Sequence, residues 1–203
     1  MQASKILFSA EEISLAENGE LILTKNRIIK KVISLFASLA DVYREVADDH
    51  RHELPGEFFD LSPKISRGEQ YLGLPYVMLD YPRIFSRENV FAIRTFFWWG
   101  NYFSLTLHLK GGYKESFQKK ILENVHLLSK YDFYVAVSED EWRQDFEKEN
   151  YVMLKTGGID LLNESIQKNA FLKLAARWPV QNGNEISVLL NEQYSAILKV
   201  ITG

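Results

Sequence analysis

The chain has 203 residues, of which 46% are hydrophobic and 25% are charged. This length and composition predict one globular domain over residues 1–203 and exclude intrinsic disorder, collagen-like repeats and coiled coil. Lysine and arginine number 24 against 27 aspartates and glutamates, and the net charge of −3 disfavours nucleic acid as a partner, because it offers no positive field. Cysteine is absent, which excludes disulfides, thiolate nucleophiles and cysteine-ligated zinc.

The sequence shows no pattern of a targeting or membrane-spanning segment. Glu11 and Glu12 occur before any apolar run long enough for a signal peptide, and no stretch approaches the ~20 apolar residues of a membrane span. These features predict a soluble, cytoplasmic protein with no membrane partner.

Two helices are predicted near the N-terminus. Ser9 and Glu12 have the spacing of a capping box, so a short helix should begin at Ser9 and end at Asn18-Gly19. Over residues 25–49, apolar side chains recur at spacings of three and four, the period of a helix with one buried face. The proline and glycine content of residues 54–70 then predicts a long irregular connection.

The central part predicts three strands. Residues 74–81 are rich in β-formers and bounded by prolines, which is typical of a strand at the edge of a sheet. Residues 89–99 and 102–109 are rich in β-branched and aromatic side chains, and Gly100-Asn101 between them suits a two-residue turn. These two strands are therefore predicted to form a hairpin.

The same patterns extend through the rest of the chain. They predict a helix over 117–128, a strand over 132–137, a short helix from the capping box at Ser138–Glu141 through Phe146, a strand over 151–155 closed by Gly157-Gly158, a helix over 159–168, a strand over 171–178 and a helix over 186–201. Helices at both ends and a central hairpin favour a single α+β domain with an antiparallel sheet packed on amphipathic helices, and the alternative is a mixed α/β sheet.

A resemblance to a known family rests on the order of short pieces and elements. Arg67-Gly68 is followed by Leu74-Pro75, a strand, the strand piece Val90-Phe91-Ala92-Ile93 and a terminal amphipathic helix. In this order the chain resembles the YktB-like family of uncharacterised bacterial proteins, while residues 82–88 depart from the family's pattern. The resemblance implies a compact α+β fold around a curved antiparallel sheet, and it implies no activity.

The predicted turn decides which hairpin side chains share a face, because directly opposed residues lie on the same side of a sheet. With Gly100-Asn101 as the turn, one face carries Ala92, Arg94, Phe96, Trp98, Phe103, Leu105, Leu107 and Leu109, and we expect it to be core. The other face carries Phe91, Ile93, Thr95, Phe97, Trp99, Tyr102, Ser104, Thr106 and His108. Flat aromatic surface beside small polar groups is typical of a ligand pocket or a partner-binding patch, although aromatic pairs also stabilise ordinary hairpins.

Arg94 is the most informative polar residue of the hairpin. A buried guanidinium is costly unless a carboxylate satisfies it, and Asp80 on the neighbouring predicted strand is the expected partner. The functional alternative is that Arg94 points into a cavity and binds an anion in a bidentate manner.

Other chemistry has little support in the sequence. His50 and His52 lack the spacing of known zinc motifs, so we expect no metal, and folding that needs none. No phosphate-binding loop, dinucleotide fingerprint or nucleophile elbow occurs, and we expect no cofactor. His108, on a strand with Ser104 and Thr106, is the residue best placed to act as a base, and general-base catalysis would require a partner within hydrogen-bond reach.

Two classes of function follow from these features. The first and preferred class is a non-catalytic domain that binds an unknown small molecule or protein through the face of the 89–109 hairpin. The second is a small hydrolase or transferase with His108 and Arg94 in a pocket. A closed cavity in which His108 faces a carboxylate would favour the second class, whereas a patch without a cavity would favour the first.

Overall fold

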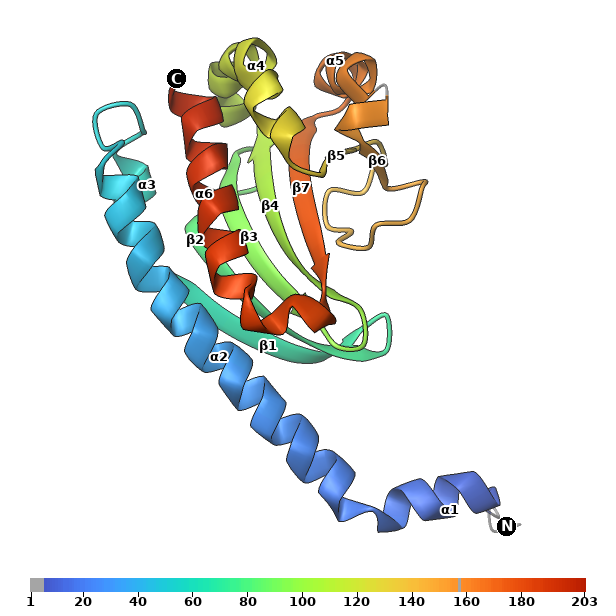
Figure 1. The fold of residues 1–203 in the computed structure, drawn as a ribbon. Helices are drawn as coiled ribbons and strands as arrows, with labels where there is room; N and C mark the ends of the chain where they lie inside the picture. Colours follow the sequence, from blue (N-terminus) through green and yellow to red (C-terminus); the bar gives the residue numbers. More distant parts are fainter. Residues whose placement is uncertain (1–5, 157) are drawn as a thin grey trace.

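The computed structural model describes residues 6–156 and 158–203, which form one α+β domain built on a single seven-stranded sheet (Figure 1). The α-helices are α1 (Ala10–Glu17), α2 (Gly19–Asp48), α3 (Glu57–Asp60), α4 (Gly112–Asn124), α5 (Gly158–Lys168) and α6 (Ile186–Thr202). The strands are β1 (Lys64–Tyr71), β2 (Leu74–Phe85), β3 (Val90–Trp98), β4 (Tyr102–Lys110), β5 (Phe133–Ala136), β6 (Tyr151–Met153) and β7 (Phe171–Pro179). Short 3-10 helices occupy η1 (Val125–Lys130), η2 (Leu154–Thr156) and η3 (Val180–Asn184).

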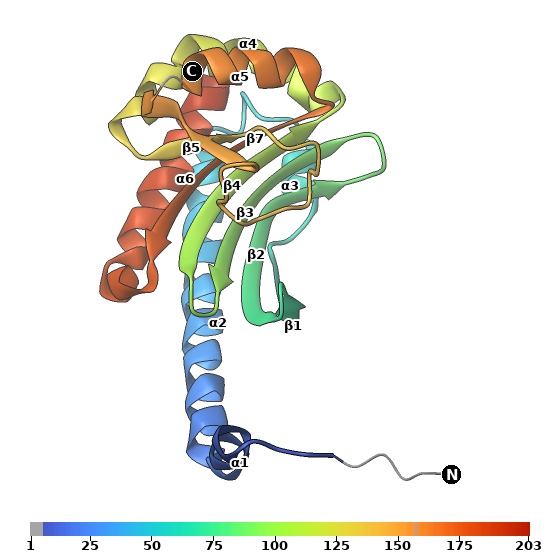
Figure 2. The ribbon, with the colours of Figure 1, turned by 90° about the vertical axis from the view of Figure 1, so that its right-hand side faces the viewer.

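The sheet is open, and its order is β1-β2-β3-β4-β7-β5-β6 with every pair antiparallel. The predicted α+β class is therefore confirmed, and the mixed α/β alternative is wrong. Helices α2 and α6 cover one face of the curved sheet, whereas the segment between β5 and β6 passes over the other face (Figures 1 and 2). The sheet thus separates a helix-covered face from a loop-covered face.

The main core lies between the helix-covered face and the two long helices. Phe36 and Tyr43 of α2 are fully buried, and the Tyr43 ring stacks on Tyr194 of α6 with centroids 3.9 Å apart. This arrangement is what the apolar period of the α2 sequence predicts, because spacings of three and four place such side chains on one face of a helix. The hydroxyl groups of Tyr43 and Thr95 are 3.1 Å apart and tie α2 to β3.

The N-terminal helices follow the predicted capping signals closely. Ser9 Oγ accepts from the Glu12 amide at 3.1 Å, and the Glu12 carboxylate accepts from the Ser9 amide, so the predicted capping box is confirmed. The predicted break at Asn18-Gly19 separates α1 from α2. Helix α2 begins six residues earlier than predicted, because the Asn18 side chain accepts from the Leu21 amide and caps a new helix there.

Two predictions around β1 and β2 are wrong. Residues 54–70 are not irregular, since they contain α3 and most of β1, and β1 rather than β2 is the edge strand. Proline does not disrupt β2, because Pro82 lies in the irregular pairing between Asp80 and Arg83. Glycine is required at position 68 of β1, because a Cβ atom there would lie 2.6 Å from the ring of Tyr76 on β2.

The hairpin is confirmed, but its register differs from the prediction by one residue. Trp98 pairs with Tyr102, so the turn has three residues, Trp99 to Asn101, and Gly100 supplies the left-handed conformation with φ of 72°. Because side chains alternate along a strand, this shift moves the β4 side chains to the opposite face relative to β3. The predicted grouping of polar side chains on one face therefore changes.

Residues 137–150 contain no helix, contrary to the capping-box prediction at Ser138. The Ser138 hydroxyl instead donates to the Asn150 side chain at 2.8 Å, and the Asp140 carboxylate accepts from the Trp142 amide within a local turn. Such local hydrogen bonds of Ser and Asp side chains offer the backbone an alternative to helix formation. We call residues 137–150 the covering loop.

Candidate functional site

A cluster of charged side chains lies on the loop-covered face of the sheet, between β2 and β7. Arg94 of β3 is opposite Asp80 of β2 and Thr106 of β4, while His108 of β4 is opposite Lys173 of β7. Opposed residues share a face, so these five side chains lie together on one face of the neighbouring strands β2, β3, β4 and β7. We call this group the polar cluster.

Arg94 and Asp80 form a bidentate ion pair, as the sequence predicted. Arg94 Nε donates to Asp80 Oδ1 at 2.7 Å, and Nη2 donates to Oδ2 at 3.0 Å. The Asp80 side chain is buried, and 18% of the Arg94 side chain is exposed. Two parallel bonds to one carboxylate hold the guanidinium in place and occupy the donors on that edge.

Lys173 is the most deeply buried charged residue of the polar cluster. It is 1% exposed, and its Nζ donates to the main-chain carbonyls of Glu141 (3.1 Å) and Arg143 (2.5 Å) in the covering loop. Burial, and then the nearby Arg94 guanidinium, lower the pKa of Lys173 from 10.5 to about 7. A neutral amine and an ammonium are therefore both populated near neutral pH.

His108 is held in its neutral form. Burial, and then the nearby charges of Lys173, Arg94 and Lys110, lower its pKa from 6.5 to about 3. Its Nε2 atom lies 3.3 Å from Glu141 Oε2 without forming a hydrogen bond, and both atoms are buried without a hydrogen-bond partner. The other Glu141 oxygen accepts from Lys110 Nζ at 2.7 Å.

Lys173 is the one buried cation of this region without a direct carboxylate partner among the described residues. Three ion pairs match one carboxylate to one cation: Asp80 with Arg94, Glu141 with Lys110, and Asp145 with Arg143. Lys173 makes no ion pair with any of the described residues, and only carbonyl oxygens accept from it. When protonated, Lys173 is thus a buried cation with no carboxylate in direct contact, although Asp140, Asp145 and Glu141 act on it from a distance and favour its protonation, and such burial costs free energy.

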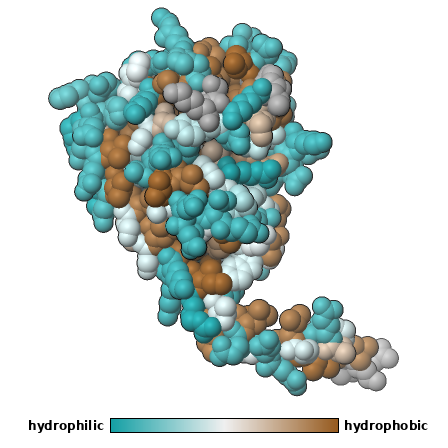
Figure 3. Space-filling model, viewed as in Figure 1, coloured by the Kyte–Doolittle hydropathy of each residue, from teal (hydrophilic) through white to brown (hydrophobic). Residues whose placement is uncertain are grey.

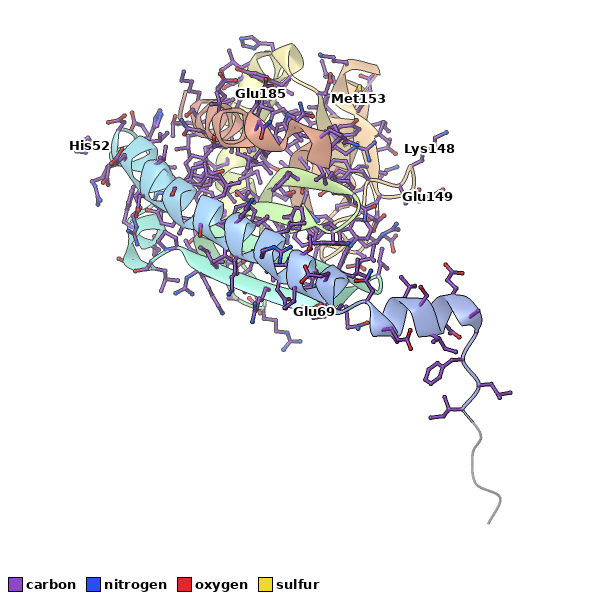
Figure 4. All side chains as sticks on the ribbon, turned by 60° about the horizontal axis from the view of Figure 1, so that its bottom comes forward. His52, Glu69, Lys148, Glu149, Met153 and Glu185 are labelled. Atoms are coloured by element: carbon purple, nitrogen blue, oxygen red, sulfur yellow. The ribbon has the colours of Figure 1, made fainter. Side chains whose placement is uncertain are left out.

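The covering loop closes the polar cluster from solvent through contacts at several points. Tyr71 Oη accepts from the amides of Gln144 (2.6 Å) and Asp145 (3.1 Å), and Tyr102 Oη donates to the Gln144 carbonyl at 3.2 Å. The Trp142 ring contacts the His108 ring edge-on, with centroids 5.6 Å apart. In contrast, Lys148 and Glu149 lie on the outer side of the loop (Figure 4).

Little space remains beneath the closed loop. The cavity bounded by Arg94, Thr106, His108, Gln144 and Lys173 has a volume of about 10 Å³, enough for one water at most. Buried polar atoms without hydrogen-bond partners nevertheless surround it or lie on the same face: His108 Nε2, Glu141 Oε2, Gln144 Oε1 and Ser104 Oγ. Such groups are uncommon in folded proteins, where buried polar atoms are nearly always paired.

The structure brings together six of the nine predicted site residues. Asp80, Arg94, Tyr102, Ser104, Thr106 and His108 lie on the loop-covered face. Thr95, Phe97 and Trp99 lie on the opposite face instead, where Thr95 contacts Tyr43 and the two aromatic rings belong to the main core. The cause of the split is the three-residue turn, because the predicted two-residue turn placed β3 and β4 one residue out of register.

Sequence reasoning missed Lys173 and the covering loop. Lys173 stands between Leu172 and Leu174 in a strand otherwise rich in apolar residues, and the reasoning that singled out Arg94 applies equally to it. Glu141 and Tyr71 carry no comparable signal, since their contacts depend on a loop and an edge strand far apart in the sequence.

No protein-family model, curated protein sequence or solved structure matches this chain in the comparisons. Within the described ranges, no group of three or more His, Asp or Glu side chains is placed to hold a metal ion. None of the described helices combines the length and apolar character that crossing a membrane requires. The site itself is therefore the basis for any functional conclusion.

Proposed function

We propose that the protein is a non-catalytic binding domain that takes up a small oxyanion, such as a phosphate or carboxylate group, in the polar cluster. The observation that carries the proposal is the Lys173 cation, which is buried beneath a loop of irregular structure and has no direct ion pair with any described residue. A bound anion would supply the direct counter-charge that Lys173 lacks, and an anion in a desolvated site interacts strongly with a lysine ammonium.

The closed cavity implies that the covering loop moves when a ligand enters. Only about 10 Å³ is available in the closed form, so the Glu141 and Arg143 carbonyls would have to release Lys173 to the ligand. Binding that requires a minor open state is weakened by the fraction of molecules that are open. We therefore expect modest affinity, together with changes in hydrogen exchange across residues 137–150 upon binding.

The test is calorimetric titration of the protein with inorganic phosphate, sulfate and acetate at pH 6, below the pKa of Lys173 of about 7. We expect saturable binding of at least one anion by the wild-type protein, and loss of that binding in Lys173→Met. Lys148→Met, on the exposed side of the same loop, is the matched control and should bind as the wild type does. Equal binding by the wild type and Lys173→Met, or no saturable binding of any of the three anions, contradicts the proposal.

The alternative function is a small hydrolase or transferase with His108 and Arg94 in a pocket. A neutral histidine with a pKa of about 3 is a weak general base, and Arg94 is already engaged by Asp80. The 3.3 Å contact between His108 and the Glu141 carboxylate is the observation in its favour. Hydrolysis of p-nitrophenyl acetate or p-nitrophenyl phosphate by the wild type, abolished in His108→Gln, would support this alternative.

A further inference from the structure

The N-terminal part of the chain extends away from the domain as a helical arm. We define the arm as residues 6–24, which comprise α1 and the first turns of α2 (Figures 1 and 2). Every residue of the arm is exposed, and contact with the domain begins at Lys25, whose Nζ lies 2.6 Å from the Glu69 carboxylate on β1. Ile29 is the first buried residue of α2.

The arm carries apolar side chains that nothing in the described chain covers. They are Ile6, Leu7, Phe8, Ile13, Leu15, Leu21, Ile22 and Leu23, followed by Ile28 at the start of the attached part of α2, with exposures from 37% to 87%. Figure 3 shows this hydrophobic surface alternating with hydrophilic surface along the arm. Helix α1 has eight residues and no buried side chain, whereas isolated helices shorter than about 12 to 15 residues are marginal in water.

We propose that the arm pairs with the arm of a second copy of this chain, in antiparallel orientation about a twofold axis near Ile22. A twofold interface places the same patch of both copies in contact, so residues before the axis in one copy face residues after the axis in the other. Ile22 would then meet its own counterpart at the centre, and Leu21 of each copy would lie near Leu23 of the other. This pairing is independent of the proposed anion site.

The charges on the two sides of Ile22 are complementary in this arrangement. Glu11, Glu12, Glu17 and Glu20 precede the axis, and Arg27, Lys30 and Lys31 follow it. Because α1 turns away from α2 at Asn18 (Figures 1 and 2), antiparallel pairing brings mainly Glu17 and Glu20 close to the basic segment of the other copy, whereas parallel pairing would place like charges side by side. Among the described residues, Lys30 and Lys31 make no ion pair, and Arg27 has only Glu20 at 3.7 Å. These cations are thus available to a second copy.

The apolar area is sufficient for a stable contact. A fully buried apolar side chain removes roughly 60 to 120 Å² from water, so these nine partly exposed side chains offer on the order of 500 Å² per copy. Burying about two thirds of that area in both copies, with the usual polar share, corresponds to an interface of roughly 1,200 Å² in total, the lower end of the standard size. We expect a dimer that dissociates on dilution.

The first experiment measures the mass of the full chain in solution by light scattering and sedimentation. We expect a concentration-dependent dimer for the wild type, and a monomer for Leu21→Asp/Ile22→Asp, whose dissociation constant should rise at least about tenfold because it places carboxylates against each other on the axis. Val188→Asp, at an exposed apolar position on α6, is the control and should remain dimeric. A wild-type chain that stays monomeric at all concentrations overturns the proposal.

A charge-exchange experiment tests the orientation. One variant carries Glu11→Lys, Glu17→Lys and Glu20→Lys, and a second carries Arg27→Glu, Lys30→Glu and Lys31→Glu; Glu12 is left intact because it closes the capping box of α1. Each variant alone should be monomeric, since the charges near the axis of its two arms are then mostly of one sign, and an equimolar mixture should form a heterodimer. Failure of the mixture to pair overturns the antiparallel arrangement.

Crosslinking locates the axis, because the chain has no cysteine of its own. Ile22→Cys should give a disulfide-linked dimer on mild oxidation, whereas Ile13→Cys, far from the axis in an antiparallel pair, should not. Equal crosslinking at both positions would indicate parallel arms and contradict the proposal. Binding of a monomeric wild type to phosphatidylglycerol vesicles would assign the arm to a lipid surface and overturn it as well.

Discussion

His108 of β4 and Lys173 of β7 are directly opposite each other in the sheet, and both side chains lie on the loop-covered face. Each is buried, and the Lys173 charge contributes to the lowered pKa of His108. Two basic groups in register at a buried position oppose each other's protonation. The free energy of unfolding should therefore depend on pH through these two residues, in two separate ranges.

Lys173 should produce a rise in stability above neutral pH. Its pKa is about 7 in the folded protein and 10.5 when unperturbed, so the unfolded state binds more protons between these values and the free energy of unfolding increases with pH. The wild type should gain ~2 kcal/mol relative to Lys173→Met between about pH 7 and pH 9. Urea unfolding at several pH values measures this difference, and Lys148→Met is the control. A Lys173→Met curve parallel to that of the wild type would contradict the lowered pKa.

His108 should act in the acidic range. Its pKa is about 3 in the folded protein and 6.5 when unperturbed, so the unfolded state takes up a proton first and stability falls as pH decreases below 6.5. His108→Gln should remove ~2 kcal/mol of that loss between about pH 6.5 and pH 4.5. His52→Gln, at an exposed position (Figure 4), is the matched control. NMR titration of the His108 ring should show no protonation above about pH 4; a midpoint near 6.5 would refute the assignment.

Removing one partner of the Arg94–Asp80 pair should strongly lower the free energy of unfolding. Arg94→Met leaves the Asp80 carboxylate buried without its bidentate partner, and we expect a loss of ~2 to 3 kcal/mol, slightly below the usual range for fully buried pairs because Arg94 is partly exposed. The double variant Arg94→Met/Asp80→Asn should lose less than the sum of the single changes. Lys119→Met, from an exposed pair with Glu123, should cost ~0.5 kcal/mol or less. Additive small effects in the cycle would show that the pair is not buried in solution.

The fold was predictable where the signal is local. The capping box of Ser9 and Glu12 and the apolar period of α2 depend on residues a few positions apart, and both are confirmed. The hairpin was predicted for the same reason. Its register depends on whether the turn contains two or three residues, and the Gly100-Asn101 pair alone does not decide between them. Residues 54–70 were misjudged because pairing with β2 outweighs their proline and glycine content.

The candidate site was predictable only in part, because its two halves come from distant segments. The ion pair was predictable because Arg94 is a charged residue in an otherwise apolar strand and Asp80 lies on the neighbouring strand. The covering loop depends on contacts such as that between Tyr71 and Gln144, which are 73 positions apart. A contact of that kind has no periodic pattern, and Ser138 even signals a helix where the loop forms.

Tyr71 should control how readily the covering loop opens. Its hydroxyl accepts from the amides of Gln144 and Asp145, so Tyr71→Phe leaves both without a partner, at a cost of ~1 to 3 kcal/mol if they stay buried. The loop should respond by opening more often, and amide hydrogen exchange over residues 137–150 should accelerate about tenfold or more, whereas β3 and β4 should keep their protection. Tyr76→Phe, on the neighbouring strand, is the matched control and should not change exchange in the loop. If Tyr71→Phe speeds exchange throughout the sheet by the same factor, the hydroxyl stabilises the whole domain and the loop does not open on its own.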